Sequence, residues 1–131
     1  MNDDLCFDTC FLIDLERERR RGAGRAMTFL RDHSTASPWI SWIVAGEFGD
    51  GFGDIDHPGC SQLLSLFNTL PFGKPVATAY AEIASSLRGS GQQIGANDVW
   101  IAANALAHQF PLVSNNAKHF DRVPGLKVLG Y

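Results

Sequence analysis

Three acidic residues and one amide stand where an α/β fold could bring them together. Asp8 follows a short apolar run, and Glu47 lies within a helix-like segment. Asp98 opens a later helix-like segment, and Asn116 follows the apolar pair at 112–113. Carboxylate oxygens are the ligands that Mg²⁺ and Mn²⁺ prefer, with water and substrate phosphate completing the shell. We therefore consider Asp8, Glu47 and Asp98 to be candidate metal ligands and catalytic residues.

A divalent ion in such a site would polarise a phosphodiester oxygen and lower the pKa of a bound water, which would then attack phosphorus in line. The expected products carry a 5′-phosphate and a 3′-hydroxyl at the new ends. Clustered carboxylates repel one another unless a cation neutralises them, so their convergence would be informative. The alternative is that Asp8 and Asp98 only cap helices and that Glu47 is solvated.

Around these residues, strand-like and helix-like patterns alternate along the chain. Strands are expected at 5–7, 38–41, 69–72, 111–114 and 123–129. Helices are expected after Thr9, at 42–48, around 63–67, at 76–87 and at 98–108, the last capped by Asn97. The charge-dense stretch 16–25 contains Gly22 and Gly24, which leaves two helices or one kinked helix open. This alternation predicts an α/β fold with a mostly parallel sheet, at whose carboxyl edge Asp8 would lie.

Composition sets the broad class. With 131 residues, 45% hydrophobic and 19% charged, the chain fits one soluble globular domain. Three cysteines without paired spacing predict reduced thiols in a cytoplasmic setting, with Cys6 and Cys10 as small core residues. The longest apolar runs are too short for a membrane span. The net charge of −3 predicts no general attraction to nucleic acid.

Four motifs in order resemble the VapC-type PIN domains, which are ribonuclease toxins of bacterial type II toxin–antitoxin systems. The motifs are Phe7-Asp8-Thr9, Ala45-Gly46-Glu47, Ile94-Gly95-Ala96-Asn97-Asp98, and Leu112-Val113-Ser114-Asn115-Asn116 with Phe120. The resemblance implies a single PIN domain over residues 1–131, with a PIN-like three-layer α/β/α architecture. It also implies an Mg²⁺-dependent endoribonuclease, with Mn²⁺ as a substitute, that is neutralised by a VapB-like antitoxin and forms a homodimer.

By the same resemblance, Asp8, Glu47 and Asp98 would be the family's acidic ligands. Thr9 and Ser114 would be neighbouring polar groups. Where many PIN domains have a fourth aspartate, this chain has Asn116, which offers a neutral carbonyl oxygen. Glu82 either compensates by reaching the cleft or is a solvated helix residue. The departure at Asn116 leaves a second hypothesis open, a catalytically degenerate PIN domain that binds RNA or protein.

Basic and aromatic residues divide between a structural and a functional interpretation. Arg17, Arg20, Arg21 and Arg88 either contact RNA phosphates or form solvated helix faces. The four histidines lack the spacing typical of metal sites, so none is assigned a catalytic role. The three tryptophans are expected in the core or in dimer contacts. A third possibility, an aspartyl-phosphate enzyme using Asp8, lacks a suitably spaced lysine partner.

Overall fold

Five strands form one sheet in which every neighbouring pair is parallel. In the computed structural model, which describes residues 3–131, the strands are β1 (Asp4–Phe7), β2 (Ser37–Ile40), β3 (Asn68–Thr69), β4 (Leu112–Val113) and β5 (Val128–Leu129). Their order is β3-β2-β1-β4-β5. The predicted α/β class is confirmed, and the sheet is parallel throughout. The predicted domain, 1–131, includes two residues outside the described part.

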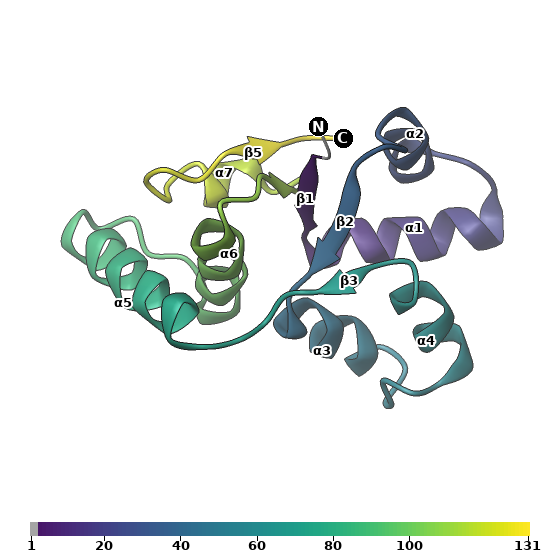
Figure 1. Ribbon diagram of the computed structural model, residues 1–131, viewed down its shortest axis with the longest axis horizontal. Helices are drawn as coiled ribbons and strands as arrows, with labels where there is room; N and C mark the ends of the chain where they lie inside the picture. Colours follow the sequence, from purple (N-terminus) through teal and green to yellow (C-terminus); the bar gives the residue numbers. More distant parts are fainter. Residues whose placement is uncertain (1–2) are drawn as a thin grey trace.

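Helices make the connections that parallel strands require. They are α1 (Thr9–Arg21), α2 (Arg25–Asp32), α3 (Trp42–Asp50), α4 (Pro58–Leu64), α5 (Lys74–Gly89), α6 (Ala96–His108) and α7 (Ala117–Phe120). Figure 1 shows α5 and α6 packed together on one side of β1 and β2, with α1 and α2 on the other. Within residues 3–131, no helix has the length and apolar character needed to cross a membrane.

The central strand β1 fixes the position of the carboxyl edge. Leu5, Cys6 and Phe7 are all buried, as expected for a strand covered on both faces. The Phe7 ring contacts the rings of Phe11 at 4.5 Å and Phe67 at 5.5 Å between centroids, which ties the end of β1 to α1 and to the segment before β3. The chain runs from β1 to β2 and β3 on one side and then returns to β4 on the other side of β1, so the carboxyl ends of β1 and β4 form a topological switch point.

A glycine-containing turn separates α1 from α2. The sequence had left open whether this stretch forms two helices or one kinked helix. Gly22 ends α1 with a φ of +117°, a conformation that side chains rarely adopt. Gly24 stands at the N-cap of α2 without a side chain to cap it. Glu18 from α1 supplies the cap instead, accepting from the N–H groups of Ala26 at 3.0 Å and Met27 at 2.9 Å. The segment is therefore two helices.

Two residues near predicted element ends have other roles than predicted. Ser41, expected at the end of a strand, is the N-cap of α3, and its hydroxyl accepts from the Val44 N–H at 3.2 Å. Asn97 was predicted to cap the next helix, and that prediction is wrong, because Gly95 is the N-cap of α6. The side chain of Asn97, already inside the first turn, is thereby free to bond across the fold.

The outer strands are shorter than predicted. β3 covers Asn68–Thr69 in place of 69–72, since Pro71 lacks the N–H that would extend a ladder. β5 covers Val128–Leu129 in place of 123–129, because a turn at Gly125, where φ is +80°, comes first. The short helix α7 between β4 and β5 was not predicted.

Candidate functional site

Asp8 occupies the junction between β1 and α1, as the sequence predicted. It is the N-cap of α1, and its Oδ1 accepts from the Thr9 N–H at 2.7 Å. Its Oδ2 accepts from the Ser114 hydroxyl at 2.7 Å and from the Cys10 thiol at 3.4 Å. The side chain is 6% exposed. Three donors therefore hold both oxygens of a nearly buried carboxylate at the positive end of a helix dipole.

Burial raises the pKa of the Asp8 carboxyl, and the negative charge of Asp98 raises it further. The hydrogen bonds from Ser114, the Thr9 N–H and Cys10 act in the opposite direction. Burial, with the charge of Asp8 second, also raises the pKa of the Cys10 thiol, which suits a thiol that donates. Asp8 and Asp98 thus share an electrostatic environment that a bound cation would relieve.

Glu47 is held by the sequence neighbours of the other two acids. Its Oε1 accepts from the Thr9 hydroxyl at 2.6 Å, and its Oε2 accepts from the Asn97 amide at 3.2 Å. Thr9 follows Asp8 in α1, and Asn97 precedes Asp98 in α6. One carboxylate on α3 therefore links the N-terminal turns of α1 and α6 at a single edge of the sheet.

Asp98 lies next to His119, a residue to which the sequence analysis assigned no role. His119 Nδ1 lies 3.4 Å from Asp98 Oδ2 and 2.9 Å from Asn116 Nδ2. The backbone N–H of Asn116 donates to the Ser114 hydroxyl at 2.9 Å, which connects this group to Asp8. The spacing of three residues between Asn116 and His119 was a usable signal, since it places two side chains on one face of a helical turn.

A family model for the PIN domain matches residues 5–126. The chain belongs to the PIN-domain family. This match confirms the predicted fold family over nearly the whole chain, and its range contains Asp8, Glu47, Asp98 and Asn116.

The sequence relatives of this PIN domain are of the VapC type. A ribonuclease VapC1 of Rickettsia felis is 34% identical over 133 residues and covers 95% of this chain and 94% of that protein. A ribonuclease VapC1 of Haemophilus influenzae is 28% identical over 92% of each chain. In a solved structure of VapBC2 from Rickettsia felis bound to a promoter DNA fragment, one chain superposes with a TM-score of 0.83, 24% identity and 98% coverage of both chains. That likeness shows the fold, and the predicted resemblance to VapC-type PIN domains is confirmed.

The donor set of this PIN domain suits a hard divalent ion carried by few protein ligands. Between residues 3 and 131, no group of three or more His, Cys, Asp or Glu side chains is close enough to hold a metal ion alone. Mg²⁺ takes one or two carboxylates and fills its other positions with water and phosphate, so a site of two carboxylates would suffice. Each oxygen of Glu47 accepts one hydrogen bond, from Thr9 or Asn97, and so keeps a lone pair free for a metal ion.

The remaining predicted site residues lie at different places around this centre. Arg17 pairs with Asp14, and Arg20 pairs with Glu16 at 3.4 Å, all on α1. The other three candidates, Arg21, Glu82 and Arg88, are exposed, and the described part of the chain shows no hydrogen bond or ion pair between them and the acids. The structure thus brings Asp8, Thr9, Glu47, Asp98, Ser114 and Asn116 together and adds Cys10, Asn97 and His119.

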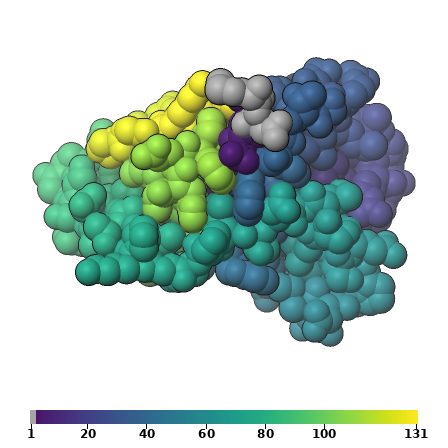
Figure 2. Space-filling model, in the orientation of Figure 1, coloured from purple at the N-terminus to yellow at the C-terminus, as the bar shows by residue number. Residues whose placement is uncertain are grey.

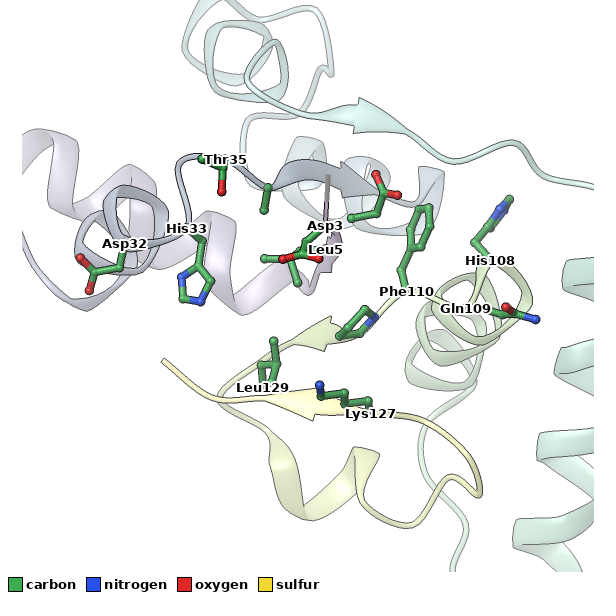
Figure 3. Close-up of a pocket in the computed structure, with 13 residues that line it drawn as sticks. Asp3, Leu5, Asp32, His33, Thr35, His108, Gln109, Phe110, Lys127 and Leu129 are labelled. Carbon is green, nitrogen blue, oxygen red and sulfur yellow. The ribbon is translucent and has the colours of Figure 1, made fainter. Parts of the chain in front are cut away.

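A cavity larger than the one that Glu47 lines lies away from this site. Its volume is about 690 Å³, and it opens at the amino ends of the strands, where Figure 3 shows Asp32, His33, His108 and Lys127 around it. It is bordered by segments 108–111 and 127–129, which lie side by side in light green and yellow in Figure 2. None of the candidate acids lines it. Size alone would therefore point to the wrong edge of the sheet.

Proposed function

We propose that this PIN domain is a metal-dependent endoribonuclease that acts as the toxin of a toxin–antitoxin pair. Relatives named ribonuclease VapC support the activity, and the VapBC structures support an antitoxin partner. The observation that carries the proposal is that Glu47 accepts hydrogen bonds from Thr9 and Asn97, the sequence neighbours of Asp8 and Asp98, so the three acids lie at one edge of the sheet. The proposed metal is Mg²⁺, for which Mn²⁺ substitutes.

Each residue of the site has a distinct part in this proposal. A divalent ion bound by Asp8 and Asp98 would supply a polarised phosphodiester and a water of lowered pKa. Ser114 and the Thr9 N–H hold the carboxylate of Asp8 in one orientation. Such fixed partners keep a ligand preorganised, so little reorganisation is needed when substrate arrives. The low exposure of Asp8 strengthens its electrostatic interactions by excluding water.

The test is cleavage of labelled RNA by the purified protein in Mg²⁺. We expect cleavage that EDTA abolishes and that Asp98→Asn lowers by at least about a hundredfold, since a ligand of the ion is removed. Asp121→Asn, the same change at an exposed aspartate, is the matched control and should cleave like the wild type. Cleavage that neither EDTA nor Asp98→Asn reduces would overturn the metal mechanism.

A second candidate is a binding module that has lost its chemistry. It is favoured by Asn116, a neutral amide at the fourth acidic position. Isothermal titration with Mg²⁺ and Mn²⁺ separates the two. No heat of metal binding, together with RNA that is bound but not cut, would favour the binding module over the enzyme.

Two partners follow from the proposed function. The antitoxin is expected to cover the acidic cleft, so that adding it abolishes RNA cleavage. A homodimer is proposed because apolar side chains remain exposed on the first helices, among them Met27 on α2 and Trp42 on α3 at 38% and 52% exposure. Light scattering that finds only the monomer at micromolar concentration would contradict the dimer.

A further inference from the structure

A groove between α1 and α3 opens directly beside Glu47. Its volume is about 440 Å³, within the range of pockets that hold drug-sized ligands. α1 contributes Ile13, Arg17 and Arg20, while Glu47 and Phe52 belong to α3 and the turn after it. We call this cavity the α1–α3 groove. Because Glu47 lines both the groove and the acidic site, the two are continuous.

The apolar part of the groove is unusually open. Ile13 is 51% exposed, although α1 buries Phe11, Leu12 and Leu15 on its other face. The half-buried Phe52 packs its ring against Phe48 at 5.3 Å and 64°. An aliphatic side chain and an aromatic ring that remain accessible beside a polar site form a surface on which a flat apolar group can rest.

The polar part of the groove consists of Arg17 and Arg20 together with the carboxylates of Glu16 and Glu47. The Arg17 and Arg20 side chains are 51% and 64% exposed, and each pairs with an acid on its own helix. Exposed ion pairs of this kind contribute little to stability, so an incoming anion can replace the acid in each pair. Guanidinium groups bind phosphate through two parallel hydrogen bonds, which makes phosphate the natural competitor.

We propose that the α1–α3 groove binds the nucleotide adjacent to the scissile phosphodiester of a single-stranded RNA. The base rests on Ile13 and Phe52, and a backbone phosphate is held by Arg20 with Arg17 beside it. RNA alternates a flat base with an anionic phosphate, which matches an apolar wall flanked by arginines. This inference rests on the proposed function. It adds to that function a binding site, the α1–α3 groove, for one base and one phosphate of the RNA substrate.

The test compares groove variants with matched variants elsewhere on the surface. Ile13→Ser and Arg20→Gln change the groove, while Leu66→Ser and Arg31→Gln make the same chemical changes at side chains of similar exposure away from it. For each groove variant we expect KM for RNA cleavage to rise about tenfold with kcat within about twofold, because stacking and phosphate contacts support binding. The matched variants should keep the wild-type KM.

Anisotropy of a labelled oligonucleotide in EDTA measures binding without cleavage and separates the two contacts. Phe52→Ala, or Phe52→Leu if the alanine variant does not fold, should weaken binding of an intact oligonucleotide but not of one with an abasic site at the groove position. Arg20→Gln should weaken binding of both, because it removes a phosphate contact.

The outcomes separate this inference from the proposed function. A wild type that cleaves RNA, with groove variants of unchanged KM and unchanged affinity, overturns the inference and leaves the function intact. If the groove variants cleave and bind RNA like the wild type but are no longer inhibited by the antitoxin, the groove binds a protein. This outcome also overturns the inference. A wild type that cleaves no RNA fails the proposed function instead.

Discussion

The Thr9 hydroxyl donates a 2.6 Å hydrogen bond to Glu47 Oε1 across 38 positions of sequence. Thr9 also presents its backbone N–H to Asp8, so one residue orients two of the candidate acids. The bond joins the first turn of α1 to α3 and sets the distance between the carboxylates on the two helices. A substitution at Thr9 should therefore change the orientation of the carboxylates while leaving all three acids in place.

Thr9→Val removes this donor and keeps the shape of the side chain. We expect metal affinity, read by titration calorimetry, to fall about 10- to 100-fold, as is usual when a partner of a metal-site residue is lost. Thr9→Ser retains a hydroxyl and should recover most of the affinity. If the valine variant binds metal and cleaves RNA like the wild type, Glu47 does not depend on Thr9.

Asp8→Asn should stabilise the metal-free protein. Burial raises the folded-state pKa of Asp8 above its ordinary value of 3.8, so the native state holds a proton more firmly than the unfolded chain. The stability linked to this group is present below the unfolded pKa and is lost as pH rises through the folded pKa. At pH 7 in EDTA the variant should melt at a higher temperature than the wild type, and the difference should shrink in acid.

Mg²⁺ should reverse that order. An ion that binds only the native state stabilises it by an amount that grows with the logarithm of ion concentration over Kd, and the asparagine variant lacks a ligand charge. We expect the melting temperature to rise with Mg²⁺ for the wild type and to stay constant for Asp8→Asn. Equal shifts in both proteins would place the ion somewhere other than Asp8.

His119→Ala should lower activity through Asp98. The imidazole lies 3.4 Å from Asp98 Oδ2 and is the side chain on α7 that faces this acid. We expect the Mg²⁺ concentration for half-maximal cleavage to rise about 10-fold or more, with a smaller effect for His119→Gln, which keeps a donor. A fall in maximal rate with unchanged Mg²⁺ dependence would contradict a role in positioning Asp98.

Glu18→Ala should destabilise the fold and spare the site. It removes the acceptor for two N–H groups at the start of α2, and the loss of such a cap costs about 1 kcal/mol. Urea unfolding should show a lower midpoint with an unchanged slope, while kcat and KM stay at wild-type values. Glu18→Gln keeps one acceptor oxygen, so its urea midpoint should lie between those of the wild type and the alanine variant. A midpoint identical to the wild type would remove Glu18 from the capping of α2.

Some features of the molecule were predictable because their causes are local. An apolar run before Asp8 makes a buried strand, and a carboxylate at the start of a helix accepts from the first free N–H groups, so β1, Asp8 and α1 follow from adjacent residues. Strands and helices alternate along the chain, and this alternation predicted a parallel sheet. Parallel strands bring their carboxyl ends to one edge.

Other features depend on residues that meet only in the folded chain. Asn97 was expected to cap its own helix, yet its amide bonds to Glu47, 50 positions away. His119 has no metal-type spacing, but α7 carries it to Asp98. The metal and catalytic roles of Asp8, Glu47 and Asp98 themselves stay predictions.

The sequence by itself determined the family, through the resemblance of its four motifs. It also determined the class of fold and the edge of the sheet at which the acids lie, because periodicity and capping act over a few residues. Only the tertiary structure decided which polar groups hold those acids and which surface continues from them. Hydrogen bonds between distant segments depend on the packing of α1, α3, α6 and α7 around the end of β1, and no spacing within one segment encodes that packing.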